Sequence, residues 1–82
     1  MAGIIRSASF TFRGRLVCES FTDFALHRAG RLDLEIGIGP CDPASATLSV
    51  KGQEDLLDAF EMACSLGPLD CVILDIERRA AD

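Results

Sequence analysis

The spacing of the apolar residues switches between two periods along this chain, and the order of the switches constrains the fold more than any other feature. Over residues 9–16 apolar and polar side chains alternate, which predicts a strand with one buried face. Over about 20–29 the apolar residues fall three and four positions apart, so a helix is expected, and Gly30 is a suitable residue to end it. Alternation returns over 32–39, which predicts a second strand.

The second half of the chain repeats this pattern after a turn-rich cluster at residues 39–43, Gly-Pro-Cys-Asp-Pro. Apolar residues alternate again over 46–51, which predicts a strand that forms a hairpin with the preceding one. A second helix is predicted to begin near the acidic residues at 53–55 and to end near the pair Gly67-Pro68, because its apolar residues form one stripe between these points.

The last strand is predicted over 71–77, and residues 78–82 are expected to fray. Successive residues of a strand point to opposite faces, so the phase of the alternation decides which side chains enter the core. In this strand Val72, Leu74 and Ile76 are expected to face one way, and Cys71, Ile73 and Asp75 the other.

An order of strand, helix, strand, strand, helix and strand with short connections gives an antiparallel sheet with two helices on one face. This is the ferredoxin-like α+β sandwich, βαββαβ. The 82 residues suffice for one small core and not for a second lobe, so one domain over 1–82 is expected. Because the architecture hosts many unrelated functions, function has to be argued from particular residues.

The formal net charge of −5 argues against nucleic acid as a partner, because binding to phosphates depends on a basic stripe. Hydrophobic residues make up 49% of the chain, but no run approaches the roughly 20 apolar residues that span a bilayer. The first residues lack the basic and apolar regions of a secretory signal. A cytoplasmic protein without a membrane partner is therefore expected.

Four cysteines, Cys18, Cys41, Cys64 and Cys71, and one histidine, His27, are the candidate metal ligands and redox groups. They include no C-x-x-C pair, and His27 is not spaced with the cysteines like a zinc ligand. Free thiols, buried or half-buried, are expected, because disulfides need an oxidising compartment that nothing in the sequence suggests. No metal site and no cofactor is predicted.

Residues 14–22, Gly-Arg-Leu-Val-Cys-Glu-Ser-Phe-Thr, have the layout of a strand end, a loop of phosphate size and a helix start. Free N–H groups and the positive end of the dipole at a helix start favour an anion. The side chains disagree with this layout, because Glu19 places a carboxylate in the loop and no arginine follows within the first helical turn. Ser20 and Asp23 are spaced as a capping box, which predicts that the helix satisfies its own free N–H groups.

The chain resembles the acylphosphatase family over essentially its whole length and without a gap. The family signature reads G-R-V-Q-G-V-G-F-R, then an asparagine at the tip of the second strand, a G-x-x-x-x-x-x-x-F helix and a G-P turn before the last strand. The matching residues are Gly14-Arg15-Leu16, Phe21, Gly52 with Phe60, and Gly67-Pro68. The resemblance implies the same βαββαβ fold.

The resemblance also implies that the catalytic groups of the family are missing. In the family the loop backbone and one arginine hold the phosphoryl group, and the asparagine positions the attacking water. The arginine position is Thr22 here and the asparagine position is Pro40, and neither side chain can do the corresponding work. Two loop glycines that permit close approach to a ligand are replaced as well. The residues equivalent to the anion loop are Val17, Cys18, Glu19, Ser20, Phe21 and Thr22, and no catalytic residue is predicted.

Other reactive groups have simpler explanations. Cys18 at a helix start could be a nucleophile, but Glu19 beside it opposes thiolate formation and the sequence places no base nearby. Arg13 or Arg15 could reach over the loop, yet strand alternation puts both on the polar face. His27 is expected to be a solvated surface residue. Four acidic residues are expected to be solvated charges rather than a cation site: Asp33, Glu35, Asp75 and Glu77. The five phenylalanines are expected in the core: Phe10, Phe12, Phe21, Phe24 and Phe60.

Two functions from different classes remain. The favoured one is a catalytically inactive acylphosphatase-like domain that binds a protein partner, or a second copy of itself, through a sheet edge or the uncovered sheet face. The alternative is an acylphosphatase-type hydrolase of acyl phosphates with a rebuilt active-site loop. Phosphate binding at the loop separates them, because the first function predicts none and the second requires saturable binding.

Overall fold

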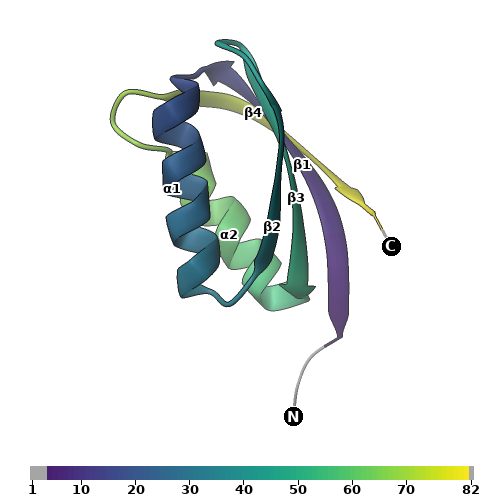
Figure 1. Cartoon of the computed structure of the whole chain (residues 1–82). Helices are drawn as coiled ribbons and strands as arrows, with labels where there is room; N and C mark the ends of the chain where they lie inside the picture. The colour runs from purple at the N-terminus through teal and green to yellow at the C-terminus, as the bar shows by residue number, and fades with distance from the viewer. Residues whose placement is uncertain (1–3, 82) are drawn as a thin grey trace.

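The computed structural model describes residues 4–81 and contains the expected strands and helices in the expected order (Figure 1). The strands form one antiparallel sheet in the order β2-β3-β1-β4, and both helices lie on the same face of it. The predicted ferredoxin-like α+β sandwich is confirmed. The elements are β1 (Ile5–Arg15), α1 (Cys18–Arg31), β2 (Glu35–Cys41), β3 (Ser45–Gln53), α2 (Glu54–Leu66) and β4 (Val72–Ala80).

Aromatic rings lie at the centre of the core, between the sheet and the helices. β1 is a central strand, and its inward side chains Phe10 and Phe12 are completely buried. Phe21 of α1 lies over Phe12 and Phe60 of α2 over Phe10, with ring centroids 5.1 Å and 5.7 Å apart. Phe24 is partly buried at the margin of this cluster. The phenylalanines are therefore core residues, as expected, and four of them are completely buried.

The connection between α1 and β2 differs from the prediction. The helix continues past Gly30 to Arg31, and β2 begins at Glu35. Asp33, expected on a strand, lies in the intervening turn with a φ of 57°, a conformation that aspartate tolerates better than most residues. Leu34 is buried, and its N–H donates to the carbonyl oxygen of Ala29 at 2.9 Å.

Neither helix in the range 4–81 is long and apolar enough to cross a membrane.

A β-bulge lies where β1 pairs with β4. Gly14 pairs with Ile73 while the preceding residue of β1 pairs with Asp75, so Leu74 is the extra residue. Ile73 and Ile76 consequently both pack against the core, and Leu74 is 75% exposed. The prediction that Val72, Leu74 and Ile76 share one face is wrong, because one extra residue reverses the alternation of a strand.

β4 continues to Ala80, so the prediction that the chain frays from residue 78 is wrong for the residues that the structure describes. Arg78 gives the physical reason. Its Nη1 lies 2.6 Å from Oδ1 of Asp58 and 3.2 Å from Oε1 of Glu61, both on α2, and its guanidinium carbon lies 5.4 Å from the centre of the Phe10 ring. These partners come from other elements, so they hold the polar end of the chain in the sheet.

Candidate functional site

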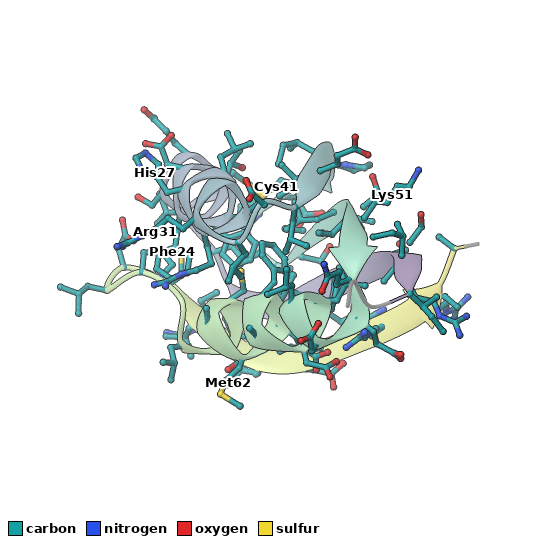
Figure 2. All side chains as sticks on the ribbon, turned by 90° about the horizontal axis from the view of Figure 1, so that it is seen from below. Phe24, His27, Arg31, Cys41, Lys51 and Met62 are labelled. Carbon is teal, nitrogen blue, oxygen red and sulfur yellow. A yellow bond between two sulfur atoms is a disulfide. The ribbon has the colours of Figure 1, made fainter. Side chains whose placement is uncertain are left out.

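A disulfide bond between Cys18 and Cys41 joins the start of α1 to the end of β2. The two Cα atoms lie 6.0 Å apart, within the usual range for bonded cysteines, and 23 residues separate the pair in the sequence. Figure 2 shows Cys41 beside α1. The prediction of free thiols is wrong for this pair, because the fold brings together two segments that share no local C-x-x-C spacing. Cys64 and Cys71 are free and buried.

Residues 18–22 form the first turn of α1 and not a loop. Val17 is extended, with φ −102° and ψ 104°, and the N–H of Phe21 donates to the carbonyl oxygen of Val17 at 2.9 Å. The N–H groups of a helix all point along its axis toward its start, so they do not wrap around a ligand as the N–H groups of a loop can. The predicted layout of a phosphate-sized loop is therefore wrong for this segment.

The predicted capping box of Ser20 and Asp23 is also wrong. Val17 occupies the N-cap position and makes no side-chain capping bond. Ser20 Oγ donates to Oδ2 of Asp70, in the connection between α2 and β4, at 2.7 Å. The side chain of the N-cap residue therefore supplies no acceptor to the first N–H groups of α1, and Ser20 links this turn to a distant segment.

The thiol of Cys71 packs behind this first turn. Its Sγ accepts a hydrogen bond from the N–H of Val17 at 3.4 Å and lies 3.8 Å from the Val17 carbonyl oxygen. Cys71 is 6% exposed, so it fills the space between the start of β4 and the start of α1. The other free thiol, Cys64, lies inside α2, where burial raises its pKa to about 12. Both therefore act as packing groups.

Two carboxylates lie at the start of α1. Glu19 is exposed in the first turn, and Asp70 is held beside Ser20 by the hydrogen bond described above. Residues 18–22 include no lysine or arginine. A phosphate placed here would meet negative charge, and the repulsion between two charges about 4 Å apart at a protein surface is worth roughly 4 kcal/mol before screening.

Arg13 lies on the outer face of the sheet, away from the helices. Its Nη1 is 3.1 Å from Oδ2 of Asp75, and its Nη2 is 3.1 Å from Oε1 of Glu77. These hydrogen bonds, to Glu77 first and Asp75 second, raise the pKa of Arg13, and the bond from Arg13 is the main cause of a lowered pKa of Glu77. Arg15 is exposed and pairs with Val72 of β4.

Across residues 4–81, histidine, cysteine and carboxylate side chains form no cluster that could hold a metal ion.

Thr22 and Pro40 lie on the two segments that the disulfide joins. Thr22 is half-buried in α1. Pro40 is exposed in β2, where the pairing with β3 shifts register between Ile38 and Cys41. An irregular stretch of an edge strand tolerates proline, which has no N–H to donate to a neighbouring strand. The structure thus brings the two expected family positions to one end of the molecule.

The turn after β2 is bound to the end of β1. Oδ1 of Asp42 accepts from two N–H groups of the turn, at 2.7 and 2.9 Å, which fixes its shape. The N–H of Gly14 donates to the carbonyl oxygen of Ala44 at 3.0 Å, and that of Leu16 to Pro43 at 2.9 Å. The end of β2 is therefore held near the start of α1 by the backbone as well as by the disulfide. Sequence reasoning missed this contact, although the Asp-Pro pair in the turn is a recognisable turn signal.

No protein-family model matches this sequence, and no curated protein matches it. Solved structures match it well. An acylphosphatase from Coxiella burnetii aligns with a TM-score of 0.86 at 14% identity, over 95% of this chain and 82% of that one. The acylphosphatase from Bacillus subtilis aligns with a TM-score of 0.84 at 19% identity, over 95% of this chain and 86% of its own.

Two further solved structures align with this chain, a much larger protein and a separate domain. Full-length HypF, in its phosphate- and nucleotide-bound form, aligns with all of this chain at a TM-score of 0.86 and 19% identity, but the match spans only 11% of HypF. The C-terminal domain of MgtC from Mycobacterium tuberculosis aligns at a TM-score of 0.65 and 15% identity, over 94% of this chain and 88% of its own. The chain has the acylphosphatase-like fold. At these identities the likeness shows the fold alone, so the site residues have to decide the function.

Proposed function

We propose that this protein is a catalytically inactive acylphosphatase-like domain that acts as an interaction module. The observation that carries the proposal is the first turn of α1, where residues 18–22 are helical and Cys18 is bonded to Cys41 of β2. A loop able to surround a phosphoryl group is replaced there by a helical turn whose second residue is Glu19.

The charges around this turn support the same proposal. Transfer of a phosphoryl group depends on positioning and on positive charge that stabilises the transition state, and removal of one such donor costs about 10²–10³ in rate. Thr22 and Pro40 stand where the family resemblance expects arginine and asparagine. Arg13 of β1 is engaged by Asp75 and Glu77 on the other side of the sheet. Arg15, two residues further along the strand, is exposed and lies on the same face as Arg13 because side chains alternate along a strand. We therefore propose that no group replaces the missing arginine.

Exposed apolar side chains indicate where an interaction module would bind. Five of the ten exposed large hydrophobic residues of the described chain lie within residues 62–74, which include the end of α2, the α2–β4 connection and the start of β4. Concentrations of exposed apolar area commonly mark protein interfaces. The part of the outer sheet face around Arg13 fits this role less well, because it carries the ion pairs of Arg13 with Asp75 and Glu77. The members of this α2–β4 apolar patch are Met62, Leu66, Leu69, Val72 and Leu74.

We propose that the α2–β4 apolar patch contacts another protein surface, and that the free edge of β4 takes part. Replacement of Leu66 and Leu69 by serine should reduce the fluorescence of a hydrophobic dye bound to the native protein. Leu26→Ser on α1 is the matched control, because Leu26 is an exposed leucine outside the patch. An equal loss of dye fluorescence in both variants would contradict the assignment.

The cytoplasmic location expected from the sequence stays a prediction. Thiol reductants in that compartment would reach the disulfide.

A phosphate titration tests the absence of an anion site directly. Inorganic phosphate is added to isotope-labelled protein, and the backbone amide signals of residues 17–22 are followed by NMR. We expect small linear shifts that match those of exposed amides elsewhere. Saturable shifts confined to residues 17–22 would contradict the proposal. Glu19→Gln is the companion variant, since removal of that carboxylate would strengthen any weak phosphate site at this turn.

The second candidate is a hydrolase of acyl phosphates with a rebuilt site. One observation favours it: the N-cap of α1, Val17, makes no side-chain bond, so the first N–H groups of the helix remain available to a ligand. Saturable phosphate binding in the same titration would support this candidate, and a signal that vanishes when the Cys18–Cys41 bond is reduced would tie it to the present shape of the turn.

A further inference from the structure

We propose that the Cys18–Cys41 disulfide is a reversible thiol–disulfide exchange site that a dithiol opens while the fold stays intact. The pair differs from the other two cysteines in its surroundings. Cys18 and Cys41 are half-buried, whereas Cys64 and Cys71 are buried. Such a site is compatible with either function considered above.

The surface around the disulfide permits attack by an incoming thiolate. Val17, which precedes Cys18, is 44% exposed, and Glu19, which follows it, is exposed. On the other strand, Pro40 and Asp42 on either side of Cys41 are both exposed. Exchange requires a thiolate to reach one of the two sulfur atoms, so access is the first condition. The exposed neighbours and the half-buried cysteines place the bond at the surface of the molecule.

The second condition is that the fold survives cleavage of the bond. The turn after β2 is held to the end of β1 by the backbone hydrogen bonds from Gly14 to Ala44 and from Leu16 to Pro43. Cys41 also pairs with Ala46 in the β2–β3 ladder. These contacts do not involve sulfur, so they keep Cys41 near the start of α1 after reduction. The two thiols then remain neighbours, which makes closure of the bond intramolecular.

The position of Cys18 decides the direction of exchange. It is the first residue of α1, and a helix N-terminus stabilises a thiolate there, although the adjacent Glu19 opposes part of this effect. The thiolate of lower pKa leaves faster, so an incoming dithiol thiolate attacks Sγ of Cys41 and the Cys18 thiolate departs with the bonding electron pair. The second thiol of the dithiol, as its thiolate, then attacks its own mixed disulfide and releases Cys41 as a thiolate. The dithiol loses two electrons and becomes a cyclic disulfide, the protein gains two electrons as two thiol groups, and the two protons of the dithiol pass to solvent or to the cysteines.

The experiment is pulse alkylation of the native protein in dithiothreitol buffers of graded reduced-to-oxidised ratio, with the labelled cysteines mapped by mass spectrometry. Cys18 and Cys41 should become labelled together, while Cys64 and Cys71 stay unlabelled and the far-ultraviolet circular dichroism spectrum is unchanged. Oxidised dithiothreitol should then restore the bond in unlabelled samples. Resistance of the bond to reduction in folded protein, or labelling of all four cysteines at once, would overturn the proposal.

Single-cysteine variants test the assigned direction of exchange. Cys41→Ser leaves the Cys18 thiol, and Cys18→Ser leaves the Cys41 thiol. At pH 7 iodoacetamide should alkylate Cys18 several-fold faster than Cys41, because a helix start favours the thiolate form of a cysteine. In guanidinium chloride the two rates should converge, because the helix is then lost. Equal rates in the folded variants, or a faster Cys41, would overturn the role given to Cys18.

Discussion

At the scale of single residues, the site was partly readable from residue types. Thr22 and Pro40 stand where the family resemblance expects an arginine and an asparagine, and Glu19 adds a carboxylate, so the proposal of an inactive site follows from the residue types alone. The disulfide was not readable, because a bond between Cys18 and Cys41 depends on the distance between two elements and not on local spacing. The sequence therefore identifies the residues at the two family positions, but it does not reveal the disulfide that joins their segments.

Loss of the disulfide should destabilise the protein measurably. A cross-link that closes a loop of this length removes chain entropy from the unfolded state worth about 3 kcal/mol in the loop-closure model. Cys18→Ser/Cys41→Ser should therefore lower the free energy of unfolding in urea by about 3 kcal/mol relative to the oxidised protein. Cys41→Ser alone should cost a similar amount, since either change breaks the bond. A double variant as stable as the oxidised protein would contradict the bond.

The ion pairs of Arg13 predict a change in the titration of Glu77. A hydrogen bond from Arg13, followed by attraction to Arg79, lowers the pKa of Glu77 in the folded protein. The resulting stabilisation is complete above the ordinary glutamate pKa and is lost as the pH falls through the lowered one. In Arg13→Ala, carboxyl NMR titration should show the pKa of Glu77 moving up toward its ordinary value. An unmoved pKa would mean that the pair is not formed in solution.

At the scale of elements, the spacing of apolar residues predicted every strand and helix. It did not predict where some of them begin or how β1 pairs with β4. The bulge between β1 and β4 reverses the alternation after Leu74, and a bulge is set by the pairing of two distant strands. The start of α1 moved to Cys18 because Val17, not Ser20, is the N-cap residue. Rules based on local sequence use only one of the two paired strands, and they do not include Asp70, which binds the side chain of Ser20.

Gly14 at the bulge predicts a sharp difference between two glycine substitutions. A Cβ atom on Gly14 would lie 1.9 Å from the carbonyl oxygen of Val72, so the two strands would have to separate. Gly14→Ala should lower the free energy of unfolding by about 1–3 kcal/mol, as overpacking does. Gly30→Ala in α1, where a Cβ meets nothing within 4 Å, should raise it by up to about 1 kcal/mol. Equal effects in thermal or urea unfolding would contradict the bulge.

At the scale of the whole molecule, the fold and the site give different information. The βαββαβ sandwich was predictable because each element has a clear period and the connections are short, and the solved acylphosphatases share it at TM-scores of 0.84 to 0.86. A fold of this kind positions a site without determining its chemistry. Here the scaffold carries a helical turn and a disulfide where the family resemblance predicts an anion loop, which is why we propose a binding role for the molecule.

The central claim is the absence of acyl phosphate hydrolysis, and the rate of benzoyl phosphate hydrolysis by the wild-type protein tests it most directly. The assay is run on the oxidised and the reduced protein, with an active acylphosphatase as the positive control. We predict the uncatalysed rate in both states, because Thr22 and Pro40 supply neither the charge nor the amide that the reaction needs. Saturable turnover well above that rate, in either state, would contradict the claim.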